Sequence, residues 1–159
     1  MTARIQDRRS TEIEASPEQV FAQIEIDPFP TFAILDTAPF LFLRLALLDG
    51  IGTARRTLAT RSGSRDELLP LELGATMGPF TVTEKRRPQT FYFTLRSLFF
   101  KCRTGFSLRT TPCGTLLSFD TIAETPTRRE RIWWFIVKPA HVLLARRVLG
   151  NIRRRALGS

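Results

Sequence analysis

Few side chains in this sequence could carry out chemistry. The single histidine, His141, is the one side chain whose ordinary pKa lies near neutrality. Glu84, Arg103 and Thr121 are the other candidates, because each falls in or beside a stretch where apolar and polar residues alternate. General acid-base catalysis needs two such groups within hydrogen-bond reach, and the sequence brings no two of them together. These four residues are therefore candidate polar groups of a binding site, and a packing or capping role is favoured for His141.

Other catalytic arrangements are not indicated. The sequence has no Ser-His-Asp set and no glycine loop of the phosphate-binding type. Cys102 and Cys113 form no Cys-x-x-Cys pair, and together with one histidine they give too few ligands for zinc. We therefore expect no metal and no cofactor. Two reduced thiols are expected, which could approach one another in one strand register.

The elements that would position these residues begin with a strand and a short helix. Residues 4 to 15 end in an alternating stretch typical of an edge strand. Ser16, Pro17 and Gln19 then supply a capping hydroxyl, a proline at the first helical position and the acceptor of a capping box. The pattern predicts a helix from Pro17 to about residue 25. Residues 27 to 39 suit a lid-like loop or a second short helix.

Strand patterns dominate from there to residue 124. Residues 91 to 95, 106 to 109 and 117 to 121 alternate in the way that a sheet with one covered face requires, and turn residues separate them. Consecutive hairpins give an antiparallel meander. Thr127 and Glu130 have capping-box spacing and open a long apolar stripe, which predicts a terminal helix with a kink or break near Pro139.

The order and spacing of these motifs resemble the START/Bet v 1-like superfamily (SRPBCC), in particular its bacterial polyketide-cyclase-like branch. The matching segments, which span nearly the whole chain, are Thr11 to Phe21, Gly50 to Arg56, Thr81 to Phe93, and Phe106 to Leu108 with Gly114 to Leu117. Residues 132 to 141 also look like the terminal helix of a related uncharacterised bacterial family. The resemblance implies an α+β helix-grip fold over a single domain, residues 1–159. Residues 151–159 form a basic tail, for which frayed helix and disorder are both open.

In that fold a curved antiparallel sheet of six or seven strands wraps the long C-terminal helix, with one or two short helices after the first strand. The resemblance implies an apolar cavity between sheet and helix. The lining that we expect is Phe80, Val82, Phe91, Phe93, Leu95, Phe106, Leu108, Leu117 and Phe119 from the sheet, and Trp133, Val137 and Leu144 from the helix. The alternative is that these side chains pack a ligand-free core.

The preferred function is binding or transport of a small hydrophobic or amphipathic molecule, such as a lipid, polyketide or aromatic metabolite, in this cavity. A cyclase- or dehydratase-type enzyme in the same cavity is the alternative. A third possible function is peripheral binding to an anionic membrane. It is indicated by the net charge of +9 and by the Trp133-Trp134-Phe135 cluster, which arginines flank. Binding of nucleic acid is disfavoured, because the aromatic and basic strand pattern of an RNA-binding domain is incomplete here. Apolar stretches are too short to span a bilayer and no signal peptide is evident, so we expect a cytoplasmic protein. The sequence predicts no particular oligomeric state.

Overall fold

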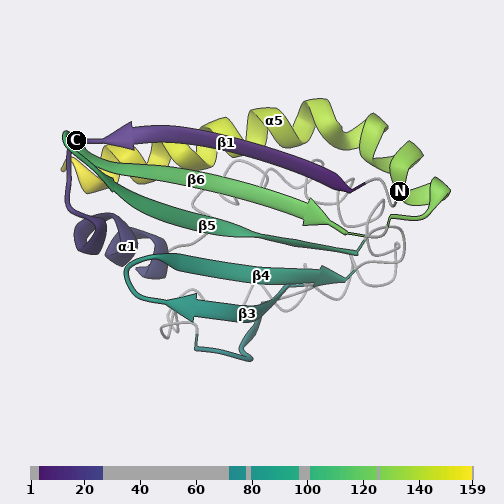
Figure 1. The fold of residues 1–159 in the computed structure, drawn as a ribbon, viewed down its shortest axis with the longest axis horizontal. Helices are drawn as coiled ribbons and strands as arrows, with labels where there is room; N and C mark the ends of the chain where they lie inside the picture. The colour runs from purple at the N-terminus through teal and green to yellow at the C-terminus, as the bar shows by residue number, and fades with distance from the viewer. Residues whose placement is uncertain (1–3, 27–71, 78–79, 97–100, 125, 159) are drawn as a thin grey trace, which may run out of the picture.

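The computed structural model describes residues 4–26, 72–77, 80–96, 101–124 and 126–158, which form one antiparallel sheet with two helices against its inner face (Figure 1). The strands lie in the order β1-β6-β5-β4-β3-β2. In chain order the elements are β1 (Ile5–Ile13), α1 (Pro17–Ile26), β2 (Thr76–Met77), β3 (Phe80–Arg86), β4 (Thr90–Arg96), β5 (Lys101–Thr111), β6 (Gly114–Ala123) and α5 (Arg128–Ala156).

The predicted α+β architecture, with an antiparallel meander and a long C-terminal helix, is confirmed. The predicted strand count is too high: the described residues hold five full strands, and the sheet reaches six only with the two-residue β2 at its edge. The lid-like loop or second helix expected in residues 27 to 39 lies outside the described residues, as do the strand patterns between residues 53 and 71. The glycine turn at Gly50 to Gly52 also lies outside them.

Alternation along the strands divides the sheet into an apolar inner face and a polar outer face. The inner face carries Phe91 and Phe93 on β4 and their cross-strand neighbours on β5 and β6, Phe106 and Phe119. All four rings are at most 4% exposed. Burying such rings is the main source of stability in a domain of this size, so this face forms the core.

Helix α1 begins as its sequence predicts. The Ser16 hydroxyl accepts a hydrogen bond from the Gln19 backbone N–H, and the Gln19 side chain accepts one from the Ser16 backbone N–H, which completes a capping box. The helix buries Val20, Phe21 and Ile24. The ring of Phe21 lies 6.1 Å from that of Phe91, so α1 covers the inner face of the sheet.

Helix α5 also opens with the predicted capping box, between Thr127 and Glu130. It runs along β1, and its main contacts are with β1, α1 and β6 (Figure 1). Of the kink or break expected near Pro139, the break is excluded, because the helix continues through the proline to Ala156. Residues 151 to 156 belong to this helix, and Ile152 is fully buried in the core cluster that also contains Val20, Phe21 and Ile24.

The two cysteines do not approach one another. Cys102 is buried near the start of β5, whereas Cys113 is exposed in the turn that follows the end of that strand. Burial raises the pKa of the Cys102 thiol to about 12, and this keeps the thiol protonated.

Candidate ligand-binding site

The pocket that stands out in the structure lies against the first turns of α5. It has a volume of about 450 Å³, which falls in the range of small-molecule sites. Its lining consists of Arg128, Arg129, Ile132, Trp133 and Ile136. Three apolar side chains thus form the wall of the pocket, and two arginines lie beside it.

The capping box fixes the start of the helix that carries this lining. Glu130 accepts a hydrogen bond from the Thr127 backbone N–H at 2.7 Å through one carboxylate oxygen. Its other oxygen accepts one from the Lys101 backbone N–H at 3.2 Å. The first turn of α5 is therefore tied to the start of β5, and Arg128 and Arg129 are held on that turn.

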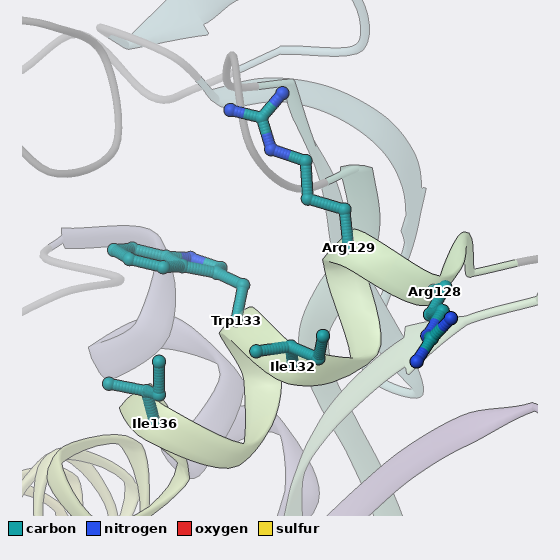
Figure 2. A pocket seen from close by; sticks show the side chains of 5 residues that line it. All are labelled: Arg128, Arg129, Ile132, Trp133 and Ile136. Atoms are coloured by element: carbon teal, nitrogen blue, oxygen red, sulfur yellow. The ribbon is translucent and has the colours of Figure 1, made fainter.

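The side chains of the pocket project in a way that separates an apolar wall from its charged rim (Figure 2). Ile132, Trp133 and Ile136 extend to one side of the helix, and Arg129 reaches over the same side. Arg128 lies at the opposite edge of the first turn. Trp133 belongs to the lining predicted from the sequence; Ile132 and Ile136 were missed, because their spacing placed them off the predicted inward stripe.

Two of the predicted polar groups meet between α5 and the sheet. Nε2 of His141 lies 2.9 Å from the Thr121 hydroxyl, which in turn lies 3.0 Å from the Thr104 hydroxyl. The imidazole stacks on Phe119 at 5.9 Å between ring centroids and lies 5.0 Å from Trp134. His141 therefore lies between Phe119 and Trp134, with its Nε2 atom engaged by the Thr121 hydroxyl.

The charged neighbours of His141 come from β1. Nδ1 of the imidazole lies 3.6 Å from a carboxylate oxygen of Asp7, and Arg9 also pairs with Asp7, at 3.0 Å. Burial lowers the pKa of His141; the Asp7 carboxylate partly opposes this effect, and Arg9 adds to it. The neutral imidazole is therefore the favoured form inside the fold. Asp7 was not singled out in the sequence, because one acid in an edge strand resembles a solvated residue.

The other two predicted polar groups, Glu84 and Arg103, lie on the outer face and not between sheet and helix. They form an ion pair with each other there. Simple alternation from Val82 would point Glu84 inward, but the register of β3 shifts between Val82 and Glu84. A bulge of this kind turns every later side chain of the strand to the other face. Lys85 occupies the inward position instead, near the Phe91 ring.

A network around Asp120 occupies the outer face and was missed in the sequence. The fully buried Asp120 carboxylate accepts hydrogen bonds from the Tyr92 hydroxyl at 2.7 Å, from the Ser107 hydroxyl at 3.1 Å and from the Arg8 guanidinium. Burial raises the pKa of Tyr92, and its hydrogen bond to Asp120 raises it further. The sequence feature that could have revealed this network is Asp120 itself, a single acidic residue within the otherwise largely apolar strand β6.

Gly105 makes this network possible. Tyr92, Gly105, Asp120 and Arg8 form one row across four strands. A Cβ atom at Gly105 would lie 2.2 Å from the Phe91 carbonyl oxygen and 2.9 Å from the Tyr92 ring. The glycine therefore lets the Tyr92 ring cross β5 to reach Asp120, while Arg103 covers that ring at 4.2 Å.

The predicted lining of the cavity divides into two groups. The nine sheet residues are all buried and belong to one packed cluster: Phe80, Val82, Phe91, Phe93, Leu95, Phe106, Leu108, Leu117 and Phe119. The three helix residues, Trp133, Val137 and Leu144, are only partly buried. Within the described residues, the sheet side of the expected lining is thus buried, and its helix side is partly exposed.

Two further features bear on what the site could hold. Among the residues that the structure describes, no three His, Cys, Asp or Glu side chains converge as a metal site would require. None of the described helices has a stretch long and apolar enough to cross a bilayer. The pocket itself offers apolar contact and positive charge.

Solved structures of low sequence identity share the fold. Protein MLL2253 of Mesorhizobium loti aligns with a TM-score of 0.53 and 13% identity, over 95% of this chain and 98% of that chain. Ara h 8.0201 aligns with a TM-score of 0.50 and 9% identity, over 99% and 100%. No curated protein matches the sequence. Because Ara h 8 is Bet v 1-like, these likenesses support a Bet v 1-like fold and carry no information on the ligand.

The match to one protein-family model covers most of the chain. Residues 1–148 match the family described as protein of unknown function, DUF2867. The match runs from the N-terminus through the capped helix, the meander and most of α5. The chain therefore belongs to the DUF2867 family.

Proposed function

We propose that this protein binds a small amphipathic molecule, with an apolar body and an anionic group, at the first turns of α5. The pocket formed by Ile132, Trp133 and Ile136 beside two arginines supports this proposal. An apolar wall contributes affinity through the area that it removes from water, and a guanidinium selects a carboxylate or phosphate by charge and hydrogen bonding. The Bet v 1-like fold is consistent with a ligand carrier.

The enzymatic alternative finds no support in this pocket. None of its lining residues, three apolar side chains and two arginines, has an ordinary pKa near neutrality. His141 does, but its Nε2 atom is engaged by Thr121, which is only 2% exposed. A binding role therefore accounts for the described residues better than acid-base catalysis does.

Calorimetric titration with two matched probes tests the proposal. Dodecanoate and dodecanol share the same apolar chain and differ in charge. We expect dodecanoate to bind about three- to tenfold more tightly, since two partly exposed arginines each contribute about as much as a surface ion pair. The double variant Arg128→Ala/Arg129→Ala should remove this preference, and Ile132→Ser/Ile136→Ser should weaken both probes.

The matched control removes the same charge elsewhere. Arg86 and Arg109 are exposed and lie on β3 and β5, and neither strand is among the main neighbours of α5. The variant Arg86→Ala/Arg109→Ala should therefore retain the preference for dodecanoate. Equal loss in the two arginine variants would refute the site, as would binding of neither probe to the unmodified protein.

A further inference from the structure

The side of α5 that points away from the sheet carries large apolar side chains. We call Ile132, Phe135, Ile136 and Leu143 the outer stripe; their exposed fractions are 57%, 82%, 63% and 61%. At about 100° per residue these positions fall within one arc of the helix. A continuous exposed apolar patch is unusual in a folded domain and marks an interaction surface.

Arginine pairs stand at both ends of the outer stripe. Arg128 and Arg129 precede it, Arg146 and Arg147 follow it, and all four are exposed. The two pairs are 18 residues apart (146 − 128), which is five turns of helix at about 3.6 residues per turn. Both pairs therefore occupy the same angular positions at the edges of the stripe, roughly 27 Å apart at a rise of about 1.5 Å per residue.

No acidic side chain offsets this charge on α5 itself. The helix has one acid, Glu130, and its carboxylate is engaged by the cap and by the Lys101 backbone N–H. From Arg131 to the end of the chain there is no Asp or Glu. The middle of this surface is therefore apolar, and arginines lie at both of its ends.

We propose that the outer stripe docks on the surface of an anionic membrane, with the axis of α5 parallel to the bilayer. Exposed apolar side chains can enter the boundary between headgroups and acyl chains, while arginines reach the lipid phosphates. The proposal goes beyond ligand binding, since Phe135, Leu143, Arg146 and Arg147 do not line the pocket. Ile132 and Ile136 belong to both surfaces, so a docked pocket would open beside the lipid.

The charges favour a membrane over other occupants. A second copy of this chain, packed stripe to stripe, would place arginine pairs near arginine pairs with no acid on the stripe to compensate. Nucleic acid would pair its phosphates with the arginines, but it would leave the apolar side chains of the outer stripe exposed to water. An anionic bilayer supplies both an apolar layer and negative charge in one plane.

Vesicle co-sedimentation tests the proposal on the full chain. We expect binding to vesicles of phosphatidylcholine mixed with phosphatidylglycerol, weak binding to phosphatidylcholine alone, and a loss of binding as salt is raised. The double variant Phe135→Ser/Leu143→Ser should reduce the partition coefficient by about tenfold or more, since two large apolar side chains no longer insert. Arg146→Ala/Arg147→Ala should reduce it by roughly 10- to 30-fold.

Each variant has a counterpart away from the stripe. Ile26 and Leu73 are also exposed, at 58% and 67%, so Ile26→Ser/Leu73→Ser removes comparable apolar surface. Arg86→Ala/Arg109→Ala removes the same two charges from β3 and β5. Both counterparts should change partitioning by about twofold or less, because their side chains do not face the bilayer in the proposed orientation.

Three results would overturn the proposal. The first is no binding to the anionic vesicles, and the second is an equal loss in stripe variants and counterparts. The third is a dimer that sediments in analytical ultracentrifugation and dissociates in Phe135→Ser/Leu143→Ser, since a second copy would then occupy the stripe. Dodecanoate titration of that variant separates the two proposals, because it leaves the lining of the pocket intact.

Discussion

The two halves of α5 have opposite relations to the rest of the molecule. From Ala145 to the end of the helix, Ala145, Val148, Leu149 and Ile152 are at most 4% exposed, and this half packs against the core and α1. Before Ala145, no residue of the helix is fully buried, and Phe135 is 82% exposed. One continuous helix thus contains a segment that serves folding and a segment whose apolar side chains the core does not use.

This difference separates the part of α5 that the core requires from the part that it does not. A helix that only covered a sheet would keep its apolar residues on one face along its full length. The first half of α5 instead carries apolar residues on both sides: Trp134 and Leu144 pack against the core, whereas Ile132 and Ile136 are exposed. The pocket and the outer stripe lie in this half, so ligand or membrane contact and folding stability should respond to different substitutions.

The largest contrast is expected between Ile152→Ala and Phe135→Ala. Ile152 is fully buried, so its truncation leaves a cavity and should lower the free energy of unfolding by about 2–5 kcal/mol. Phe135→Ala removes a larger side chain but should change stability by less than about 0.5 kcal/mol, because that side chain is already in water. Urea unfolding followed by circular dichroism measures both values. A large loss for Phe135→Ala would mean that its ring packs in solution, and the division of α5 would be wrong.

The next effect concerns His141, which lies at the boundary between the two halves. Its pKa is lowered in the folded protein, chiefly by burial, so the folded state binds fewer protons than the unfolded state near the ordinary pKa of about 6.5. Stability should therefore rise with pH through this window and be fully present above it. As the pH falls below about 6.5, the unfolded chain takes up a proton first, and stability is lost until the folded state is protonated too.

Urea midpoints at several pH values, compared between the unmodified protein and His141→Gln, isolate this contribution. The chain has one histidine, so the difference between the two pH profiles belongs to residue 141 and its contacts with Asp7 and Arg9. We expect the profile of the variant to be flatter between about pH 5 and 7. Parallel profiles would show that the imidazole is more accessible to water than its position suggests.

Local signals in the sequence were sufficient for the elements of this fold. The capping boxes at Ser16 and Thr127 and the alternation in β4, β5 and β6 each depend on residues close together in the chain, and each is confirmed. The failures have long-range causes. Pro139 does not break α5, because contacts on both sides of the proline outweigh one lost backbone hydrogen bond.

The site was less predictable than the fold. Glu84 was expected among the polar groups of the cavity, but a single bulge in β3 turns its side chain to the outer face. The sequence of residues 80 to 86 contains no feature that predicts this bulge. Asp120 and Tyr92 meet only because Gly105 lies between them on another strand, so no pattern within one segment reveals the pair. The sequence predicted a binding site among the phenylalanines of the sheet, and the pocket described above lies on α5. A periodic pattern identifies apolar residues without telling which of them the core will bury.

The smallest predicted effect tests whether both halves of α5 unfold together with the core. Gly150 is helical and exposed, and a Cβ atom there would have no heavy atom within 4 Å. Gly150→Ala should therefore stabilise the protein by about 0.5–1 kcal/mol, since alanine loses less backbone entropy in a helix. Ala140 is exposed in the first half, and Ala140→Gly should cost a similar amount if the helix melts as one unit. Thermal unfolding of the two variants gives both values. A gain for Gly150→Ala with no loss for Ala140→Gly would show that the first half opens before the core does, as a segment free to rearrange on a ligand or a membrane would.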